Sequence, residues 1–436
     1  MLALALSAAL VPAARAESAF ADSVADATSV LAQRGGAFPA PSAPMASIIP
    51  PSFSLAELIE LARDRSPAAQ AGRARVDGAR AGLVSAAARP NPGVEFEAGR
   101  HGASGGAIPG ASGAIAIVQP LDRSSLREAR MATAATALDV TRSQVEALNR
   151  DRLAELTLRY FDILRLQAAA RLAEEDLSIA EQIAARVEVR VGTGEAPRFE
   201  LIRANAERLN ARRAVQAAAA RVDVARAELR RMVGNALPAD FAVTGSLEDK
   251  VLPLESFDAL RDRMLVQHPD LLAARAAILN AQARMSLEQE RARPSFALRG
   301  SIDRVPEVVD SRLGLTVQIP VFDRREGPIA EAAADVARSR AELLDRELAL
   351  TQALEAAWRR DRIAQEQIQA YEAGLLREAE AALRVAEAAY RYGERGILDF
   401  LDAQRTLRLL RQELNATRFE LRTARVEIER LSAGSY

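Results

Sequence analysis

The chain has 436 residues, with 58 Lys or Arg against 59 Asp or Glu, and a formal net charge of −1. Only 4% of the residues are aromatic, whereas 49% are hydrophobic and 27% are charged. This balance is typical of long helices with interleaved charges, and the near-zero net charge gives no reason to expect nucleic acid as a partner. Because the sequence has no cysteine and only two histidines, disulfides, thiolate chemistry, a lipid-modified cysteine and clustered Cys or His metal sites are excluded.

The first 16 residues, MLALALSAALVPAARA, are typical of a signal peptide. An apolar run precedes Ala14-Arg15-Ala16, a small-x-small cleavage site, so we predict a cleaved signal peptide over residues 1–16. Residues 17–52 are rich in Ala, Ser and Pro and are predicted to be a poorly ordered leader. No other apolar run approaches the roughly 20 residues of a membrane helix, so we expect strands to make any membrane insertion.

The rest of the sequence is duplicated with an offset near 200 residues. Residues 66–92 parallel residues 268–294, QPLDR parallels IPVFDR, and TGEAP (193–197) parallels YGERG (392–396). We predict two copies of one unit, joined by a linker and followed by a short tail. The first copy covers 53–234, the linker 235–253, the second copy 254–432 and the tail 433–436.

Each copy is predicted to contain a short helix, a second helix, a very long helix and a return helix. Ser54 and Glu57 form a capping box, and Pro67 and Pro269 occupy the first position of the second helices. Tyr160 is expected to pack at a helix interface, as is Trp358. The predicted helices are 54–65, 67–88, 124–190 and 198–232 in the first copy, and 254–267, 269–291, 327–392 and 397–431 in the second.

Between the second and the long helix, each copy has two segments in which apolar and polar residues alternate. This period of two predicts β-hairpins at about 93–119 and 295–319. In GVEFEAGR, Val94 and Phe96 lie on one face and the acids on the other. The candidate lumen-facing residues on the polar faces are Glu95, Glu97, Arg299 and Gln318.

Four strands leave open edges, and the neighbouring helices are too charged and too long to cover an apolar sheet face. We therefore expect the apolar face to meet lipid and the polar face to line water. A bilayer accepts strands only in closed barrels, which have at least eight strands, so several chains would share one barrel. The alternative is a small soluble sheet whose polar face is merely solvated.

Two glycine breaks reverse the chain between the long and return helices. Gly194 and Gly393 suit a tight reversal because glycine adopts positive φ freely. Glu200 and Asp399 follow near the start of each return helix, where the helix dipole favours acids. A helix reversal without any partner is the alternative interpretation.

The duplicated unit, the QPLDR and IPVFDR motifs and the paired glycine breaks together resemble the TolC-type outer-membrane efflux proteins, over residues 53–431. VFDRREGPIAEA and YGERGILDFLDAQRTL are most similar to the CzcC-like heavy-metal efflux branch. The resemblance implies a mainly α fold with a small β part. In it, a homotrimer forms a 12-strand transmembrane β-barrel, and long coiled-coil helical hairpins form a periplasmic tunnel.

The resemblance further implies a passive exit duct in the outer membrane, part of a tripartite RND-type efflux system. Its partners would be a periplasmic adaptor (a membrane fusion protein), an inner-membrane RND pump and outer-membrane lipid. The cargo implied is divalent heavy-metal cations such as cobalt, zinc and cadmium. Drug efflux, type I protein secretion and a soluble periplasmic coiled-coil scaffold are the alternatives. No catalytic constellation or phosphate loop is visible, so neither an enzyme nor a cofactor is expected.

The resemblance places adaptor contacts at the two helix tips, and charges near the tips are candidates for a gate. The implied docking residues are Gly192, Gly194, Glu195, Ala196, Glu200, Gly393, Glu394, Arg395, Gly396 and Asp399. The candidate gate residues are Arg190 and Asp402, with Arg395 beside them.

Overall fold

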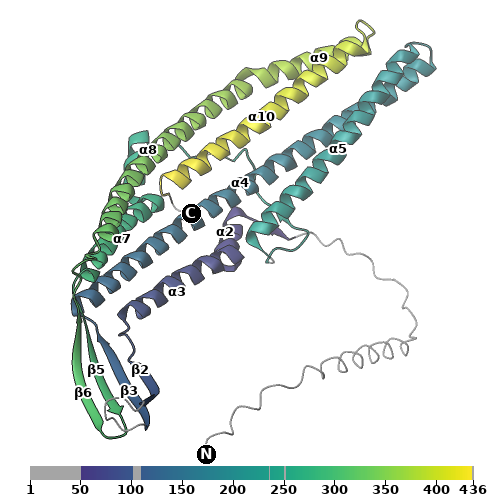
Figure 1. Ribbon diagram of the computed structural model, residues 1–436. Helices are drawn as coiled ribbons and strands as arrows, with labels where there is room; N and C mark the ends of the chain where they lie inside the picture. The colour runs from purple at the N-terminus through teal and green to yellow at the C-terminus, as the bar shows by residue number, and fades with distance from the viewer. Residues whose placement is uncertain (1–50, 102–109, 235, 250–251, 435–436) are drawn as a thin grey trace, which may run out of the picture. The chain divides into compact units, whose positions relative to one another are not determined.

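The computed structural model describes residues 51–101, 110–234, 236–249 and 252–434 (Figure 1). The predicted signal peptide, 1–16, and residues 17–50 of the predicted leader lie outside the described residues. Ser52, which the sequence analysis assigned to the leader, begins a short strand, β1 (Ser52–Phe53), that pairs in parallel with β4 (Ala242–Val243). None of the described helices combines the length and the apolar character that a bilayer-spanning helix needs.

Local signals account for where the helices begin. The Ser54 side chain accepts a hydrogen bond from the backbone N of Glu57 at 3.4 Å, and Glu57 Oε2 accepts one from Ser54 N at 2.7 Å, which confirms the capping box. The helices of the first copy are α2 (Leu55–Arg65), α3 (Pro67–Ala87), α4 (Ser124–Gly192) and α5 (Arg198–Val233). Those of the second are α6 (Phe257–Gln267), α7 (Pro269–Arg291), α8 (Glu326–Ala370), α9 (Leu376–Arg391) and α10 (Ile397–Leu431).

The long helices of the two copies differ. α4 is continuous over 69 residues, a length of about 100 Å at 1.5 Å per residue. In the second copy a π-turn at Tyr371–Leu375 separates α8 from α9. The chain is helical throughout Glu326–Arg391, which confirms the predicted long helix over 327–392, but the π-turn was not predicted because a single wide turn leaves no mark in a 3.6-residue hydrophobic pattern.

The predicted hairpins form one antiparallel sheet in the order β2-β3-β5-β6. Its strands are β2 (Gly93–His101), β3 (Gly110–Leu121), β5 (Ser295–Arg304) and β6 (Val309–Gln318). They have 9, 12, 10 and 10 residues; three of them fall within the roughly 9–11 residues of a transmembrane strand, and β3 is one residue longer.

No helix in the described part of the chain covers the apolar face of this sheet. Cross-strand pairing puts Phe96 opposite Ile115, and Leu313 opposite Gly300, on that face. Phe96 is 75% exposed and Leu313 79% exposed. Isolated in water, such a face would be a large apolar patch, which monomeric soluble proteins rarely expose.

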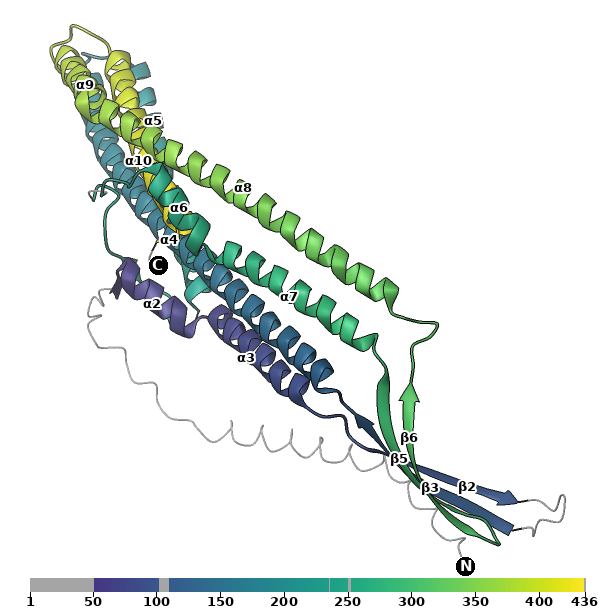
Figure 2. The same ribbon diagram turned by 90° about the vertical axis from the view of Figure 1, so that its left-hand side faces the viewer.

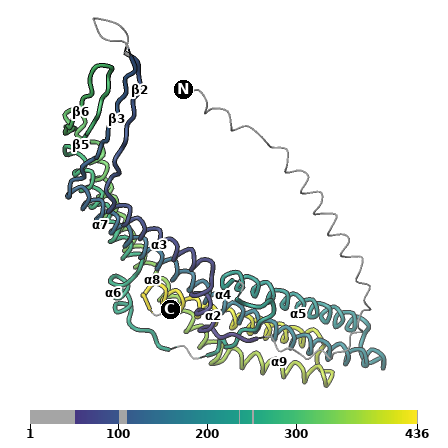
Figure 3. Tube along the Cα trace, turned by 90° about the horizontal axis from the view of Figure 1, so that it is seen from below, coloured from purple at the N-terminus to yellow at the C-terminus, as the bar shows by residue number. Residues whose placement is uncertain are grey.

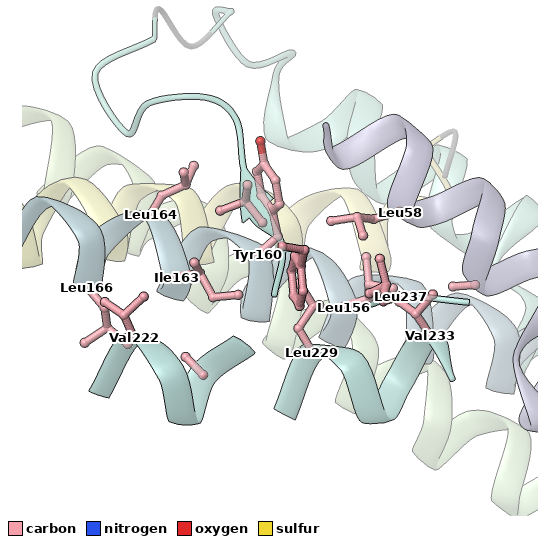
Figure 4. Packing of buried hydrophobic residues seen from close by; sticks show 14 of the residues in the cluster. Leu58, Leu156, Tyr160, Ile163, Leu164, Leu166, Val222, Leu229, Val233 and Leu237 are labelled. Atoms are coloured by element: carbon pink, nitrogen blue, oxygen red, sulfur yellow. The ribbon is translucent and has the colours of Figure 1, made fainter. Parts of the chain in front are cut away.

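The first hydrophobic core lies where α2, α4 and α5 meet (Figure 4). Tyr160, Leu156 and Leu229 are buried together there, and Tyr160 thus lies at a helix interface as predicted. The predicted linker, 235–253, takes part in this core. Its buried residues are Leu237, Phe241, Val243 and Leu247.

A second core joins α6, α7, α8 and α10, and Trp358 packs against it with its ring centroid 6.3 Å from that of Phe257. Neighbouring helices follow a regular order within the chain: α3 packs on α4, α4 on α7, and α7 on α8 (Figure 2). The strands follow α3 and α7 and precede α4 and α8, so they lie at one end of these helices (Figure 3). The turns between α4 and α5 and between α9 and α10 lie at the other end.

Candidate functional site

The turn between α4 and α5, here called tip 1 (residues 189–200), has the geometry of a Schellman motif. Gly194 has a φ of 78°. The backbone N of Glu195 donates to the carbonyl of Arg190 at 2.8 Å, and Gly194 N donates to the carbonyl of Val191 at 3.2 Å. These two bonds satisfy carbonyls that the end of α4 would otherwise leave unpaired.

The turn between α9 and α10, here called tip 2 (residues 388–399), repeats this geometry 199 residues later. Gly393 has a φ of 75°, Glu394 N donates to the carbonyl of Ala389 at 2.9 Å, and Gly393 N donates to that of Tyr390 at 3.2 Å. Each bond is the counterpart of one in tip 1. The sequence match between the two breaks therefore encodes the same backbone twice.

The side chains predicted to dock a partner lie at the surface of the two tips. Gly192, Gly194, Glu195, Gly393, Glu394, Arg395, Gly396 and Asp399 are exposed, and Ala196 and Glu200 are half-buried. A Cβ added at Gly194 or Gly393 would meet no atom within 4 Å. Glycine is thus required at these positions by the backbone conformation and not by lack of space.

The two tips are held together within one chain by an aromatic contact that the sequence analysis missed. The Arg190 guanidinium lies 4.9 Å from the centre of the Tyr390 ring, and the Tyr390 hydroxyl donates to Glu200 Oε2 at 3.4 Å. The Tyr390 ring stacks on Phe400 with centroids 6.1 Å apart. Burial raises the pKa of Tyr390, and the nearby Glu200 carboxylate raises it further. Nothing local in the sequence pairs residue 190 with residue 390.

An ion pair adds to this connection a turn further from the tips. Arg186 of α4 donates to Glu387 of α9 at 3.1 Å, and Arg391 donates to the same carboxylate at 2.9 Å. The hydrogen bond from Arg186 lowers the pKa of Glu387, and Arg391 lowers it further. Further up the hairpins, Arg408 of α10 pairs with Glu207 of α5 at 3.2 Å.

The candidate gate residues do not contact one another within the chain. Arg190 lies on Tyr390 and 3.9 Å from Glu195, and Arg395 pairs with Asp399 at 3.5 Å. Asp402 is exposed and makes no ion pair within the described part of the chain. A gate made by these groups would need contacts between chains, so that role stays a prediction.

The candidate lumen-facing residues share the polar face of the sheet. Arg299 pairs with Glu95 at 2.9 Å across β3, whose Ala116 and Val118 lie opposite them. Gln318 Oε1, at the edge strand, accepts a hydrogen bond from the Ser295 hydroxyl at 3.3 Å. Half of the acidic pair that the sequence analysis selected is therefore neutralised by a cross-strand arginine.

Further acids lie beside Glu97 on this face. Glu97 is opposite Ala114, Ala114 is opposite Asp303, and Asp303 is opposite Asp310, so three carboxylates lie in one row across the sheet. Arg312 pairs with Asp310 at 3.1 Å and lies 3.8 Å from Asp303. Within the described residues, no group of three or more His, Asp or Glu side chains is arranged to hold a metal ion.

The family model described as Outer membrane efflux protein matches residues 58–235 and 260–434, that is, both copies. The chain is 27% identical over 290 residues to the cobalt-zinc-cadmium resistance protein CzcC of Cupriavidus metallidurans. The aligned region covers 66% of this chain and 69% of that protein. The solved structure of CusC is similar with a TM-score of 0.73 and 19% identity, over 87% of this chain and 92% of CusC. Outer membrane protein VceC of Vibrio cholerae is similar with a TM-score of 0.72 and 18% identity, over 87% and 96%.

Proposed function

The chain belongs to the outer membrane efflux protein family. From this we propose that three chains together form the outer-membrane exit duct of a tripartite RND-type efflux system. The family is one of efflux proteins and not of enzymes. The four-stranded sheet, with an exposed apolar face and open edges at β2 and β6, is one third of a shared barrel. The mature chain, without its signal peptide, inserts these strands in the outer membrane and projects the helices into the periplasm.

The repeated backbone of tips 1 and 2 carries this proposal. Both tips lie at the same end of the helices, and a trimer presents them alternately around one opening. A ring of six similar turns suits the helical hairpin ends of a periplasmic adaptor, which connects the duct to an inner-membrane RND pump. The exposed backbone at Gly194 and Gly393 lets such a hairpin approach closely, since no side chain intervenes.

Divalent heavy-metal cations are the proposed cargo. The likeness to CzcC supports this cargo class, and so does the charge of the polar sheet face. On that face Glu95, Glu97, Asp303 and Asp310 outnumber Arg299 and Arg312. A surplus of acids along a lumen raises the local concentration of cations. No binding site is required for this effect.

Complementation tests the cargo. A strain that lacks the gene is grown in cobalt, zinc or cadmium and in a panel of drugs, with and without the plasmid-borne wild-type protein. We expect the protein to restore metal tolerance alone. Restored drug tolerance without metal tolerance would overturn the proposed metal cargo but not the proposed role as an exit duct. A purified mature chain that is monomeric and soluble without detergent would overturn the duct.

Substitutions at the tips test adaptor docking. Gly194→Val with Gly393→Val should abolish complementation and leave trimers in the outer membrane, because valine disfavours positive φ while its Cβ has free space. The matched Gly→Asn pair, which tolerates the left-handed conformation, should retain most activity. Full activity of the valine pair, or loss of its trimers, would contradict a docking role.

A further inference from the structure

A cleft of about 890 Å³ lies beside α4 in the first copy. The end of α2, the first two thirds of α3, the end of α5 and residues 145–156 of α4 line it. Its volume is in the range of roughly 300–1,000 Å³ that is typical of small-molecule sites. Because one chain supplies this lining, the cleft does not depend on the proposed duct.

Arginine is the commonest charged residue in the lining of the cleft. Six arginines and three acids line it, which gives a surplus of three positive charges. The arginines are Arg63, Arg73, Arg80, Arg150, Arg152 and Arg231. Arg73 lies 3.8 Å from Asp64, and Arg80 pairs with Asp77 at 3.2 Å. The other four make no ion pair with any described residue, so their charges are available to an anion.

Arg150 lines the cleft and has an unsatisfied donor. Its Nη1 atom is buried without a hydrogen-bond partner among the described residues, and a buried charged donor of this kind indicates a missing acceptor. The nearby His268 cannot supply that acceptor. Burial lowers the pKa of His268 and the charge of Arg150 lowers it further, so the ring is neutral at pH 7. Its Nδ1 accepts a hydrogen bond from the backbone N of Asp270 at 3.2 Å, which leaves the proton on Nε2.

The second copy does not repeat this concentration of arginine. The counterparts of Arg63, Arg80, Arg150 and Arg152 are Leu265, Gln282, Thr351 and Ala353. The two arginines that the second copy keeps, Arg275 and Arg430, are paired with Glu347 at 3.5 Å and with Asp151 at 2.9 Å. Since the second copy builds the same order of helices without them, the four additional arginines are not needed for the fold.

We propose that this cleft binds a ligand that carries phosphate groups. Each guanidinium presents its N–H groups as a planar fork that matches two phosphate oxygens, and a phosphate monoester brings close to two negative charges at pH 7. α3 begins at the cleft, and the N–H groups and the dipole of a helix start also attract phosphate. Buried Leu153 and Leu156 and half-buried Met232 give the lining an apolar part, which suits an organic group attached to the phosphate.

Calorimetric titration of the full chain in nonionic detergent tests this site. Pyrophosphate is the probe for a free phosphoryl compound, and dihexanoyl phosphatidic acid is the probe for a phospholipid headgroup, with titration into detergent alone as its blank. We expect at least one probe to bind saturably, with one site per chain, and to raise the melting temperature. The probe that binds identifies the source of the phosphate. Citrate, a carboxylate anion of comparable charge, should bind at least about tenfold more weakly.

Paired substitutions test whether the cleft arginines hold the probe. Arg63→Gln with Arg231→Gln changes two exposed side chains of the lining and should weaken binding about tenfold or more, because charged hydrogen bonds are lost. The matched control is Arg208→Gln with Arg212→Gln, which removes the same charge from exposed positions of α5. These positions lie about 30 Å along the helix from Arg231, beyond the screening length, so affinity should change by less than about twofold.

The contrary outcomes are distinct from failure of the duct, which complementation measures separately. Absence of saturable binding by both probes, binding of citrate as tight as that of phosphate, or an equal loss in the two arginine pairs would overturn the site. Binding that appears only in dissociated monomers would show that a second copy covers the cleft, and it would overturn the site as well.

Discussion

Tyr160 in the first copy and Asp361 in the second occupy equivalent positions on the long helices, yet Tyr160 is buried among apolar side chains and Asp361 is buried in an ion pair. Tyr160 lies in a large apolar core and donates its hydroxyl proton to the carbonyl of Thr244. Asp361 is 1% exposed, pairs with Arg425 of α10 and accepts a hydrogen bond from Gln365 at 2.6 Å. The surrounding helices correspond between the copies: α2 and α5 pack on α4, and their counterparts α6 and α10 pack on α8.

The difference follows from what covers each core. The segment 236–249 folds over the first core and supplies apolar side chains and a carbonyl acceptor for Tyr160. In the second core α10 covers the equivalent place and supplies Arg425. The two copies therefore share their helix order and turns, which local residues determine. They differ in the polarity of the buried side chains, which depends on whether segment 236–249 or α10 covers the core.

The largest effect is expected at the ion pair. Asp361→Ala should lower the free energy of unfolding by about 3–5 kcal/mol, because it leaves the Arg425 charge buried without a partner. Denaturant unfolding of the detergent-purified protein measures this loss. The double change Asp361→Leu with Arg425→Leu should recover most of it. A single variant no less stable than the double one would show that the pair is not buried in solution.

The role of the segment over the first core is tested next. Leu237→Ala should cost about 2–5 kcal/mol, as expected for a leucine removed from a packed core. Leu252→Ala in the same predicted linker is the control, because Leu252 is 82% exposed and its loss should change little. Equal effects of the two variants would mean that the segment does not belong to the core.

A smaller effect is expected at the tyrosine that corresponds to Asp361. Tyr160→Phe keeps the ring and removes only the hydrogen bond to Thr244, so it should cost about 0.5–1.5 kcal/mol. Tyr392→Phe, on an exposed tyrosine at tip 2, is the control and should be neutral. If Tyr160→Phe were as damaging as Asp361→Ala, the two positions would not differ in the way described.

The smallest effect concerns the ion pair that connects α4 with α9. The folded state lowers the pKa of Glu387 from its ordinary 4.5, so the pair stabilises the fold above that pH, and its contribution is lost as the pH falls through the lowered value. Arg186→Gln should cost a few tenths of a kcal/mol at pH 7, because both side chains are partly exposed. Melting temperatures of variant and wild type should converge once the pH has fallen below the lowered pKa of Glu387. A difference that persists there would implicate packing instead.

Much of the fold could be predicted because its signals are local. The capping box at Ser54, the helix-opening prolines and the glycines at positions 194 and 393 fixed helix ends to within a few residues, and alternation identified both hairpins. The family resemblance and the mainly helical fold class are confirmed. The assigned docking and gate residues stay predictions.

The unpredicted features depend on residues far apart in the chain. No local pattern indicates that Arg425 reaches Asp361, that Phe241 of the linker is buried, or that Arg190 lies on Tyr390. The first contact depends on packing within the second copy, the second on how the linker packs on the first copy, and the third on how the two copies pack on each other. The sequence alone aligns Tyr160 with Asp361, but only the structure shows that both side chains are buried.

The π-turn at Tyr371–Leu375 changes the rotational phase of everything that follows it. Each α-helical residue turns the chain by about 100°, so a turn that takes in one extra residue shifts the later side chains around the axis by that amount. With this turn in place, the Tyr390 ring of α9 stacks on Phe400 of α10, with ring centroids 6.1 Å apart. Deleting one residue from this turn would leave a regular helix whose far end faces the wrong way, with Tyr390 rotated away from Phe400 while the sheet end kept its alignment.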